Sequence, residues 1–164
     1  MHVTIEKATE TMLPEMYPVF DDSALYDHYF KPHPESLSFM LDGATKNGDT
    51  LIARAANGEI VGVMVVLMQG FAELPYLALL GIKKKYRGMG IGKKFLAVFI
   101  GLAEQSGAPN MFIMTSTFNV RAKQLYESAG FKKIGIIPNY LIKGIDEIMF
   151  VRPNKKTKQK NEIR

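Results

Sequence analysis

Residues 79–94 read LLGIKKKYRGMGIGKK and lead from an apolar stretch through a glycine-rich loop into a second apolar stretch. The alternate glycines at 88, 90 and 92 allow a tight turn whose backbone N–H groups can approach a ligand closely. A helix expected from about Gly90 adds unpaired N–H groups and the positive end of its dipole. Six bases and no acid lie between Lys83 and Lys94. The stretch is therefore predicted to bind a diphosphate.

Two common phosphate-binding signatures do not fit this loop. A P-loop needs glycine where Arg87 stands and a hydroxyl residue where Lys94 stands, and the dinucleotide fingerprint begun at Gly88 needs glycine where Lys93 stands. The pattern that fits is R-x-x-G-x-G, from Arg87 to Gly92. This pattern resembles the acyl-CoA loop of the GNAT superfamily of N-acetyltransferases.

A second motif begins at Asn119, continues through Ala122 to Tyr126 and ends at Gly130-Phe131. Asn119 and Tyr126 are seven residues apart and therefore share one face of a helix. Taken alone, Asn119 is typical of a helix N-cap and Tyr126 of a half-buried core residue. Downstream of the glycine loop, the whole motif resembles the same superfamily.

The resemblance implies that acetyl-CoA is the co-substrate, that no metal takes part, and that the acetyl group passes directly to a primary amine. It implies that Asn119 bonds the pantetheine, that backbone N–H groups at 80–82 polarise the thioester, and that Tyr126 protonates the leaving thiolate. The absence of cysteine is consistent with direct attack. The residues assigned to acetyl-CoA are Leu80, Gly81, Ile82, Arg87, Gly88, Met89, Gly90, Ile91, Gly92, Lys93, Asn119 and Tyr126.

The general base is less well defined. Glu73 is the only acid between Glu59 and Glu104, and it opens an expected strand at 73–82. Family members often place a base glutamate nearer the middle of this strand, where Tyr76 stands here. Glu73 fits that role only if Pro75 marks a bulge, which proline near the start of a strand allows, as it also allows an edge strand. The alternative is an ordered water.

Acids and aromatic residues gather at 21–33, and Tyr26, Asp27 and Tyr29 are the candidates for contact with the acceptor. Residues 1–80 hold four bases and eleven acids, whereas residues 81–151 hold eleven bases and four acids. Acids beside aromatic rings suit an ammonium group, so a small cationic amine is predicted as the acceptor. A protein or peptide amine is the alternative. The ribosomal-protein N-terminal acetyltransferases carry a glutamate where Met114 stands, which argues against that class. The acids and aromatic residues at 21–33 are also compatible with a purely structural role, as a helix surface and part of the core.

The order of apolar patterns predicts an α/β fold with a mixed, largely antiparallel twisted sheet. The resemblance adds helices on both faces and a splayed strand pair that forms the acyl-CoA groove. One domain is expected over 1–152, with a basic, disordered tail at 153–164. Strands are expected at 2–7, 50–55, 60–68, 73–82, 109–116, 132–137 and 143–151, and helices at 9–20, 34–46, 91–105 and 119–129.

Composition excludes several classes of protein. The 164 residues include no cysteine and three histidines, so a disulfide scaffold, a thiolate nucleophile and a histidine-built metal site are not expected. No signal peptide or membrane span is expected, which favours a cytoplasmic protein. The net charge of +5 comes from 152–164, with six bases and one acid, so a nucleic-acid partner is not expected. A catalytically silent acyl-CoA-binding module is an alternative, and analogy with the family suggests a homodimer.

Overall fold

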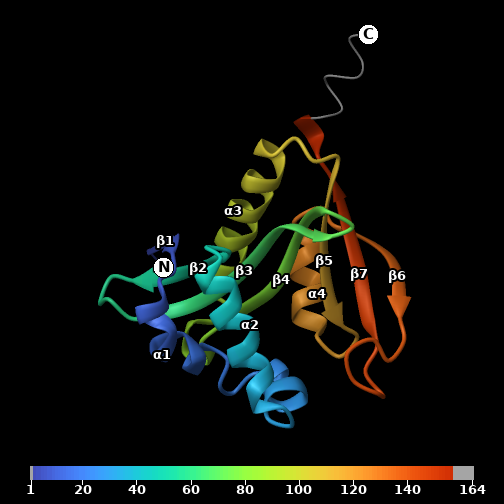
Figure 1. Ribbon diagram of the computed structural model, residues 1–164. Helices are drawn as coiled ribbons and strands as arrows, with labels where there is room; N and C mark the ends of the chain where they lie inside the picture. The colour runs from blue at the N-terminus through green and yellow to red at the C-terminus, as the bar shows by residue number, and fades with distance from the viewer. Residues whose placement is uncertain (1, 157–164) are drawn as a thin grey trace. The chain divides into compact units, whose positions relative to one another are not determined.

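The computed structural model describes residues 2–156, and its seven strands are hydrogen-bonded in the order β1-β2-β3-β4-β5-β7-β6 (Figure 1). Strands β4 and β5 pair in parallel, whereas the pairs β1–β2, β2–β3, β5–β7 and β6–β7 are antiparallel. The expected α/β architecture with a mixed, largely antiparallel sheet is therefore confirmed.

The contacts of the chain fall into two compact units. Within the described residues, unit 1 comprises 2–66 and 79–95, and unit 2 comprises 67–78 and 96–156. The expected single domain over 1–152 stays a prediction. Disorder was expected over 153–164. Pro153 ends β7, and Asn154 is buried and donates to the carbonyl of Ala108 at 2.8 Å, whereas residues 157–164 lie outside the described residues.

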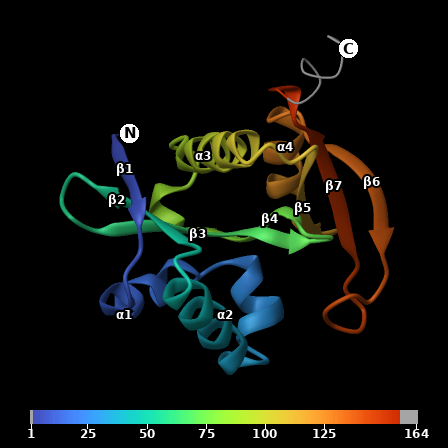
Figure 2. The same ribbon diagram turned by 45° about the horizontal axis from the view of Figure 1, so that its top comes forward.

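Unit 1 begins with β1 (Val3–Lys7), which pairs with β2 (Thr50–Ala55), and β2 pairs in turn with β3 (Ile60–Phe71). Helix α2 (Pro34–Lys46) has the predicted bounds and buries its apolar face. Helices α1 (Leu13–Met16) and α2 lie on the same side of β2 and β3 (Figure 2).

The continuous helix expected at 9–20 is wrong. The segment forms three short turns, η1 (Glu10–Met12), α1 and η2 (Tyr17–Val19). Pro14 and Pro18 stand at the start of α1 and η2. The first turn of a helix tolerates the missing N–H group of proline, but a proline there prevents the preceding turn from continuing. The segment that follows, which the sequence left unassigned, contains the π-helical turn η3 (Tyr26–Phe30).

Unit 2 is built on β5 (Asn110–Ser116), which pairs with β7 (Glu147–Pro153), and β7 pairs with the outer strand β6 (Lys132–Ile137). Helix α4 (Val120–Ser128) lies beside β5 (Figure 1). Phe99, in the part of α3 (Ile91–Gln105) that belongs to unit 2, stacks on Phe131 with 6.3 Å between ring centroids. This ring contact joins α3 to the residue that precedes β6 in the core of unit 2.

The last strand starts later than expected, at Glu147 instead of Lys143. The intervening loop satisfies its own backbone groups. Gly144 donates its N–H to Asn139 Oδ1 at 2.6 Å, and Asn139 donates its N–H to Asp146 Oδ1 at 3.1 Å. Side chains thus take the place of a strand partner in this segment.

Strand β4 (Leu74–Ile82) follows β3 through a two-residue turn at Ala72 and Glu73, whose φ angles are +51° and +61°. Both residues therefore adopt the left-handed conformation of a tight hairpin turn. Glu73 does not open the strand, as the sequence suggested, but lies exposed in this turn. Pro75 does not mark an edge strand either, because β4 lies between β3 and β5. It is the second residue of β4, before the pairing of Tyr76 with Phe112.

Candidate functional site

The glycine loop of unit 1 has the backbone shape that its spacing predicts. After β4 the chain forms the turn η4 (Lys84–Tyr86), and Gly88 and Gly90 then adopt φ angles of +82° and +83°. A Cβ atom at Gly90 would meet no atom within 4 Å, so glycine is needed there for its conformation and not for space. Helix α3 starts at Ile91, and Gly90 accepts the N–H of Lys94 at 3.2 Å. Exposed backbone therefore leads directly into a helix N-terminus.

Two of the six basic side chains in this loop pair with a carboxylate of unit 1. Lys83 Nζ and Lys85 Nζ each lie 3.0 Å from a carboxylate oxygen of Glu59, and Tyr86 donates its hydroxyl to Glu59 at 2.6 Å. The hydrogen bonds from Tyr86, Lys85 and Lys83 lower the pKa of Glu59 to about 2. We call Glu59, Lys83, Lys85 and Tyr86 the loop clamp. The sequence analysis missed Glu59, because it lies 24 residues before Lys83 in the chain.

Arg87, the first residue of the family pattern, supports the loop through backbone carbonyls. Its Nε donates to the carbonyl of Ile82 at 2.9 Å, and its NH1 donates to that of Asp22 at 3.1 Å. Lys84 Nζ lies 4.0 Å from the carboxylate of Asp22. Lys93, in the first turn of α3, and Met89 are exposed. Backbone N–H groups and Lys93 therefore remain the candidates for direct contact with a diphosphate.

The strand that precedes the loop contains a glycine that packing requires. A Cβ atom at Gly81 would lie 2.4 Å from the ring of Phe20, which is fully buried. Leu80 and Ile82 are half-buried neighbours on the same strand. The role of this backbone in polarising a thioester stays a prediction.

The second motif lies in unit 2. The Asn119 Oδ1 atom accepts the N–H of Ala122 at 3.2 Å, which confirms Asn119 as the N-cap of α4. The cap uses the side-chain oxygen, so the NH₂ group still has the chemistry to donate to a ligand carbonyl. Tyr126 is only 5% exposed, and its ring meets that of Phe150 edge-on with 6.0 Å between centroids.

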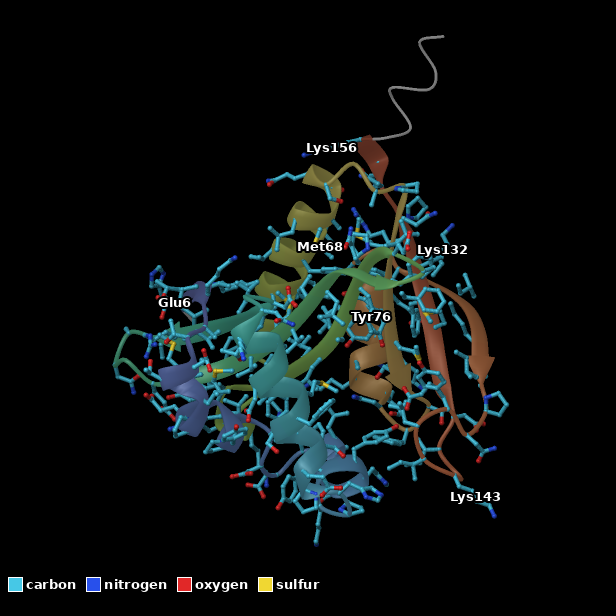
Figure 3. The ribbon with its side chains drawn as sticks, viewed as in Figure 1. Glu6, Met68, Tyr76, Lys132, Lys143 and Lys156 are labelled. Carbon is cyan, nitrogen blue, oxygen red and sulfur yellow. The ribbon has the colours of Figure 1, made fainter. Side chains whose placement is uncertain are left out.

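Two phenol groups and a carboxylate interact electrostatically in unit 2. Burial, then the charges of Tyr76 and Glu147, raise the pKa of Tyr126 above its ordinary value. Burial, then Tyr140 and Glu147, likewise raise the pKa of Tyr76. Both phenols are therefore protonated at neutral pH. Figure 3 labels Tyr76, which lies on β4.

The sequence analysis assigned no role to Glu147, although it is buried in this group. Its side chain is 4% exposed and accepts a hydrogen bond from Ser116 Oγ at 2.8 Å. The one available signal was an acid followed directly by the apolar residues at 148–151. Glu73, the base suggested by the sequence, lies in the exposed β3–β4 turn, and its role stays a prediction.

The three acceptor candidates share the π-helical turn η3 of unit 1 but differ in exposure. Asp27 is exposed, Tyr26 is half-buried, and Tyr29 is buried at 9% exposure. Asp27 and Tyr26 are thus accessible to a ligand, whereas Tyr29 contributes mainly to the core. Their contact with an acceptor stays a prediction.

Two further properties concern metal ions and membranes. Among residues 2–156, no three histidine, aspartate or glutamate side chains are grouped so that they could share a metal ion. In the same part of the chain, every helix is too short or too polar to cross a bilayer.

Comparisons with known proteins agree on one family. The model of the acetyltransferase (GNAT) family matches residues 9–131. The chain is 30% identical over 98 residues to N-alpha-acetyltransferase 30 of Schizosaccharomyces pombe, covering 58% of this chain and 65% of that protein. It is 24% identical over 95 residues to N-acetylaspartate synthetase of Xenopus tropicalis, covering 58% of this chain and 35% of that protein. The chain thus spans less than two thirds of the length of these two curated relatives.

A solved structure supports the fold. The GNAT superfamily phosphinothricin acetyltransferase of Sinorhizobium meliloti, in complex with AcCoA, superposes with a TM-score of 0.73 at 19% identity, covering 94% of this chain and 89% of that one. The matched region 9–131 includes both the glycine loop and the motif from Asn119 to Tyr126. This chain therefore belongs to the acetyltransferase (GNAT) family.

Proposed function

We propose that this protein transfers the acetyl group of acetyl-CoA directly to a primary amine. The observation that carries the proposal is the left-handed pair Gly88 and Gly90, which leads exposed backbone into the N-terminus of α3. Such a terminus offers N–H groups and a positive dipole end to a phosphate. Family membership and the AcCoA complex of the Sinorhizobium meliloti enzyme support acetyl-CoA as the co-substrate.

Each part of the co-substrate has candidate partners. The backbone N–H groups at 88–93, with the charge of Lys93, would bind the diphosphate. The NH₂ group of Asn119 would donate to a pantetheine carbonyl. Backbone N–H groups at 80–82 would polarise the thioester, because donors aimed at a developing oxyanion stabilise the tetrahedral intermediate.

The amine must lose a proton before it attacks. A lysine-like amine with a pKa of about 10.4 is unprotonated in about one molecule in 2,500 at pH 7. Glu73 in the exposed turn, or an ordered water, would receive this proton. The amine nitrogen then bonds to the thioester carbon, and the C–S bond breaks to release the CoA thiolate.

Tyr126 would stabilise the departing thiolate. Because its pKa is raised, its phenol is protonated at neutral pH and can donate. Thiols have a pKa of about 8.5, so the phenol is the weaker acid. It therefore acts chiefly as a hydrogen-bond donor to the growing negative charge, and solvent supplies the proton of the free thiol.

A small cationic amine is the first candidate acceptor. Exposed Asp27 beside half-buried Tyr26 offers a carboxylate and an aromatic ring to an ammonium group. Residues 1–80 hold seven more acids than bases, and this negative charge also favours a cationic acceptor. The second candidate is the α-amino group of a peptide, favoured by the similarity to N-alpha-acetyltransferase 30.

The test is thiol release from acetyl-CoA with a panel of amines. The panel contains a polyamine, an amino sugar, peptides with free N-termini and the same peptides N-acetylated. Release with the small amines supports the first acceptor, and release that needs a free peptide N-terminus supports the second. If the protein binds acetyl-CoA but no amine in the panel causes thiol release, it is a catalytically silent acyl-CoA-binding module. Higher salt should raise the KM of a cationic acceptor. The cytoplasmic location and the homodimer stay predictions.

A further inference from the structure

The carboxylate of Glu59 is placed by a tight hairpin of unit 1. Glu59 follows the turn between β2 and β3, where Gly58 adopts a φ angle of +87°. The carbonyl of Glu59 accepts the N–H of Ala55 at 2.9 Å, and the N–H of Glu59 donates to Asn57 Oδ1 at 3.2 Å. Both backbone groups of Glu59 are therefore bonded within the hairpin, which gives its side chain a fixed starting point.

The side chain of Glu59 reaches the turn η4, which directly precedes the glycine loop. Its carboxylate lies 3.0 Å from the Nζ atoms of both Lys83 and Lys85, and it accepts the hydroxyl of Tyr86 at 2.6 Å. The backbone makes the same connection, because Lys83 donates its N–H to the carbonyl of Val61 on β3 at 2.9 Å. These contacts attach the turn to the β2–β3 hairpin, two residues before the first left-handed glycine of the loop.

We propose that Glu59 is a positioning residue for the diphosphate of acetyl-CoA, because it fixes the turn η4 and thereby the direction of the backbone N–H groups that follow at 88–93. The inference rests on the proposed function for its co-substrate alone and requires no acetyl transfer. Glu59 does not touch the ligand, since a carboxylate repels a diphosphate. Its ion pairs with Lys83 and Lys85 also offset positive charge beside the loop. The loop therefore binds by backbone direction more than by lysine charge.

A purely electrostatic role of Glu59 predicts the opposite result. Glu59→Gln removes a negative charge and weakens the hold on Lys83 and Lys85, so the surroundings of the loop become more positive. If charge alone controlled binding, the variant would bind the anionic acetyl-CoA more tightly. If positioning controls binding, the variant binds acetyl-CoA more weakly, because the N–H groups lose their common direction. The sign of the change in the Kd of acetyl-CoA therefore separates the two roles.

The experiment measures the Kd of acetyl-CoA for wild type and Glu59→Gln by isothermal calorimetry at pH 7. The Kd should rise about three- to tenfold, the usual scale when a substitution acts on a ligand through intervening residues. Acetyl-pantetheine carries the same thioester arm without the diphosphate, and its Kd is obtained by competition with acetyl-CoA. That Kd should stay unchanged, whereas a general loosening of the fold would raise both values.

Tyr86→Phe tests the same role without a change of charge. It removes the hydroxyl that donates to Glu59 and leaves both lysine pairs in place. An electrostatic role predicts an unchanged Kd of acetyl-CoA, whereas positioning predicts a rise that is smaller than in Glu59→Gln. Tyr86→Phe also decides the proposal if Glu59→Gln does not fold.

Glu104→Gln is the matched control. Glu104 lies in unit 2 near the C-terminal end of α3, the end away from the glycine loop. Like Glu59, it is partly buried and lies near two cations, with Arg152 at 3.1 Å and Lys156 at 3.8 Å. Its substitution removes the same charge and should lower stability, but the Kd of acetyl-CoA should stay unchanged.

A Kd of acetyl-CoA that falls or stays constant in Glu59→Gln would overturn the proposal, and so would equal rises for acetyl-CoA and acetyl-pantetheine. If acetyl-pantetheine does not compete in wild type, the sign of the change for acetyl-CoA decides alone. A wild type that binds acetyl-CoA but releases no thiol with any amine refutes acetyl transfer and leaves the comparison of Kd values decisive. A wild type that does not bind acetyl-CoA refutes both the proposed function and this inference.

Discussion

The glycine loop of unit 1 and the Tyr126–Glu147 region of unit 2 solve different problems with different parts of the chain. The loop presents exposed backbone, and the loop clamp turns charged side chains into internal supports. The region around Tyr126 presents buried side chains, and burial, then Tyr76 and Glu147, raise the pKa of its phenol. Binding by backbone thus leaves a glycine pattern in the sequence, whereas buried chemistry depends on residues that only the fold brings together.

The largest expected effect lies in unit 2. Tyr126→Phe removes the hydroxyl that would donate to the thiolate and keeps the ring against Phe150. The kcat should fall by about 10²- to 10³-fold, the usual scale for losing one hydrogen-bond donor to a developing negative charge. The Kd of acetyl-CoA should stay unchanged if the loop of unit 1 supplies most of the binding. Thiol release and isothermal calorimetry measure the two quantities.

Tyr17→Phe provides the control for that variant. Tyr17 is in unit 1, donates its hydroxyl to Asp42 and has a pKa raised to about 12, chiefly by burial. Its loss should lower stability but leave kcat unchanged. An unchanged kcat in Tyr126→Phe would remove Tyr126 from its proposed role.

In unit 1 the backbone conformation of the loop should control binding. Gly90→Ala places a Cβ atom in open space but forces it into the left-handed region, at a cost of about 1–2 kcal/mol. We expect lower stability and an acetyl-CoA Kd raised by up to about tenfold, with kcat less affected. Gly101→Ala also meets open space, but within α3, so it should stabilise the protein by about 1 kcal/mol. If Gly90→Ala and Gly101→Ala both raised or both lowered the free energy of unfolding, this explanation would be contradicted.

The loop clamp should produce a smaller effect with a characteristic pH dependence. Glu59→Gln weakens the contacts with Lys83 and Lys85, so the Kd of acetyl-CoA should rise several-fold. The folded-state pKa of Glu59, about 2, lies below its ordinary value of 4.5. The clamp therefore stabilises the fold fully above pH 4.5 and loses this effect as the pH falls towards 2. Urea unfolding of both proteins should give a stability difference that narrows over this range.

The smallest expected effect is an alkaline loss of stability from unit 2. The folded-state pKa of Tyr126 lies above the ordinary value of 10.0, so the unfolded chain releases its phenol proton first. Stability from this group is complete below pH 10 and declines above it, by up to about 1.4 kcal/mol per pH unit. Unfolding at pH 9 to 11 should show a shallower decline in Tyr126→Phe than in wild type. Equal slopes would show that Tyr126 does not titrate differently on folding.

The sequence predicted the parts of the fold that local patterns specify. Helix α2 keeps its predicted bounds because its apolar spacing and its Asn47-Gly48 end are local signals. A continuous helix does not form at 9–20, because Pro14 and Pro18 interrupt it despite the apolar spacing. The place of Glu73 before an apolar strand does not reveal that it lies in a turn, because the left-handed turn at Ala72 and Glu73 lacks the usual glycine or asparagine.

The sequence likewise predicted those parts of the candidate site that local patterns specify. The glycine loop and the Asn119 cap follow from residues close together in the chain. Glu59 and Glu147 were missed because their partners lie 24 to 31 residues away, and only strand pairing brings them together. The basic residues of the loop were counted as anion ligands, but Lys83 and Lys85 neutralise Glu59.

The close approach of Phe20 to Gly81 has a consequence for how chemistry and core depend on each other. The peptide groups at 80–82, which would hold the thioester, can keep their direction only while an aromatic ring fills the space beside Gly81. A smaller side chain at Phe20 would let the peptide groups at 80–82 change direction, although it touches no reacting atom. A larger residue at Gly81 would displace the strand itself. Phe20, a buried apolar side chain with no role in the chemistry, would thereby help to fix the direction of the amides that hold the thioester.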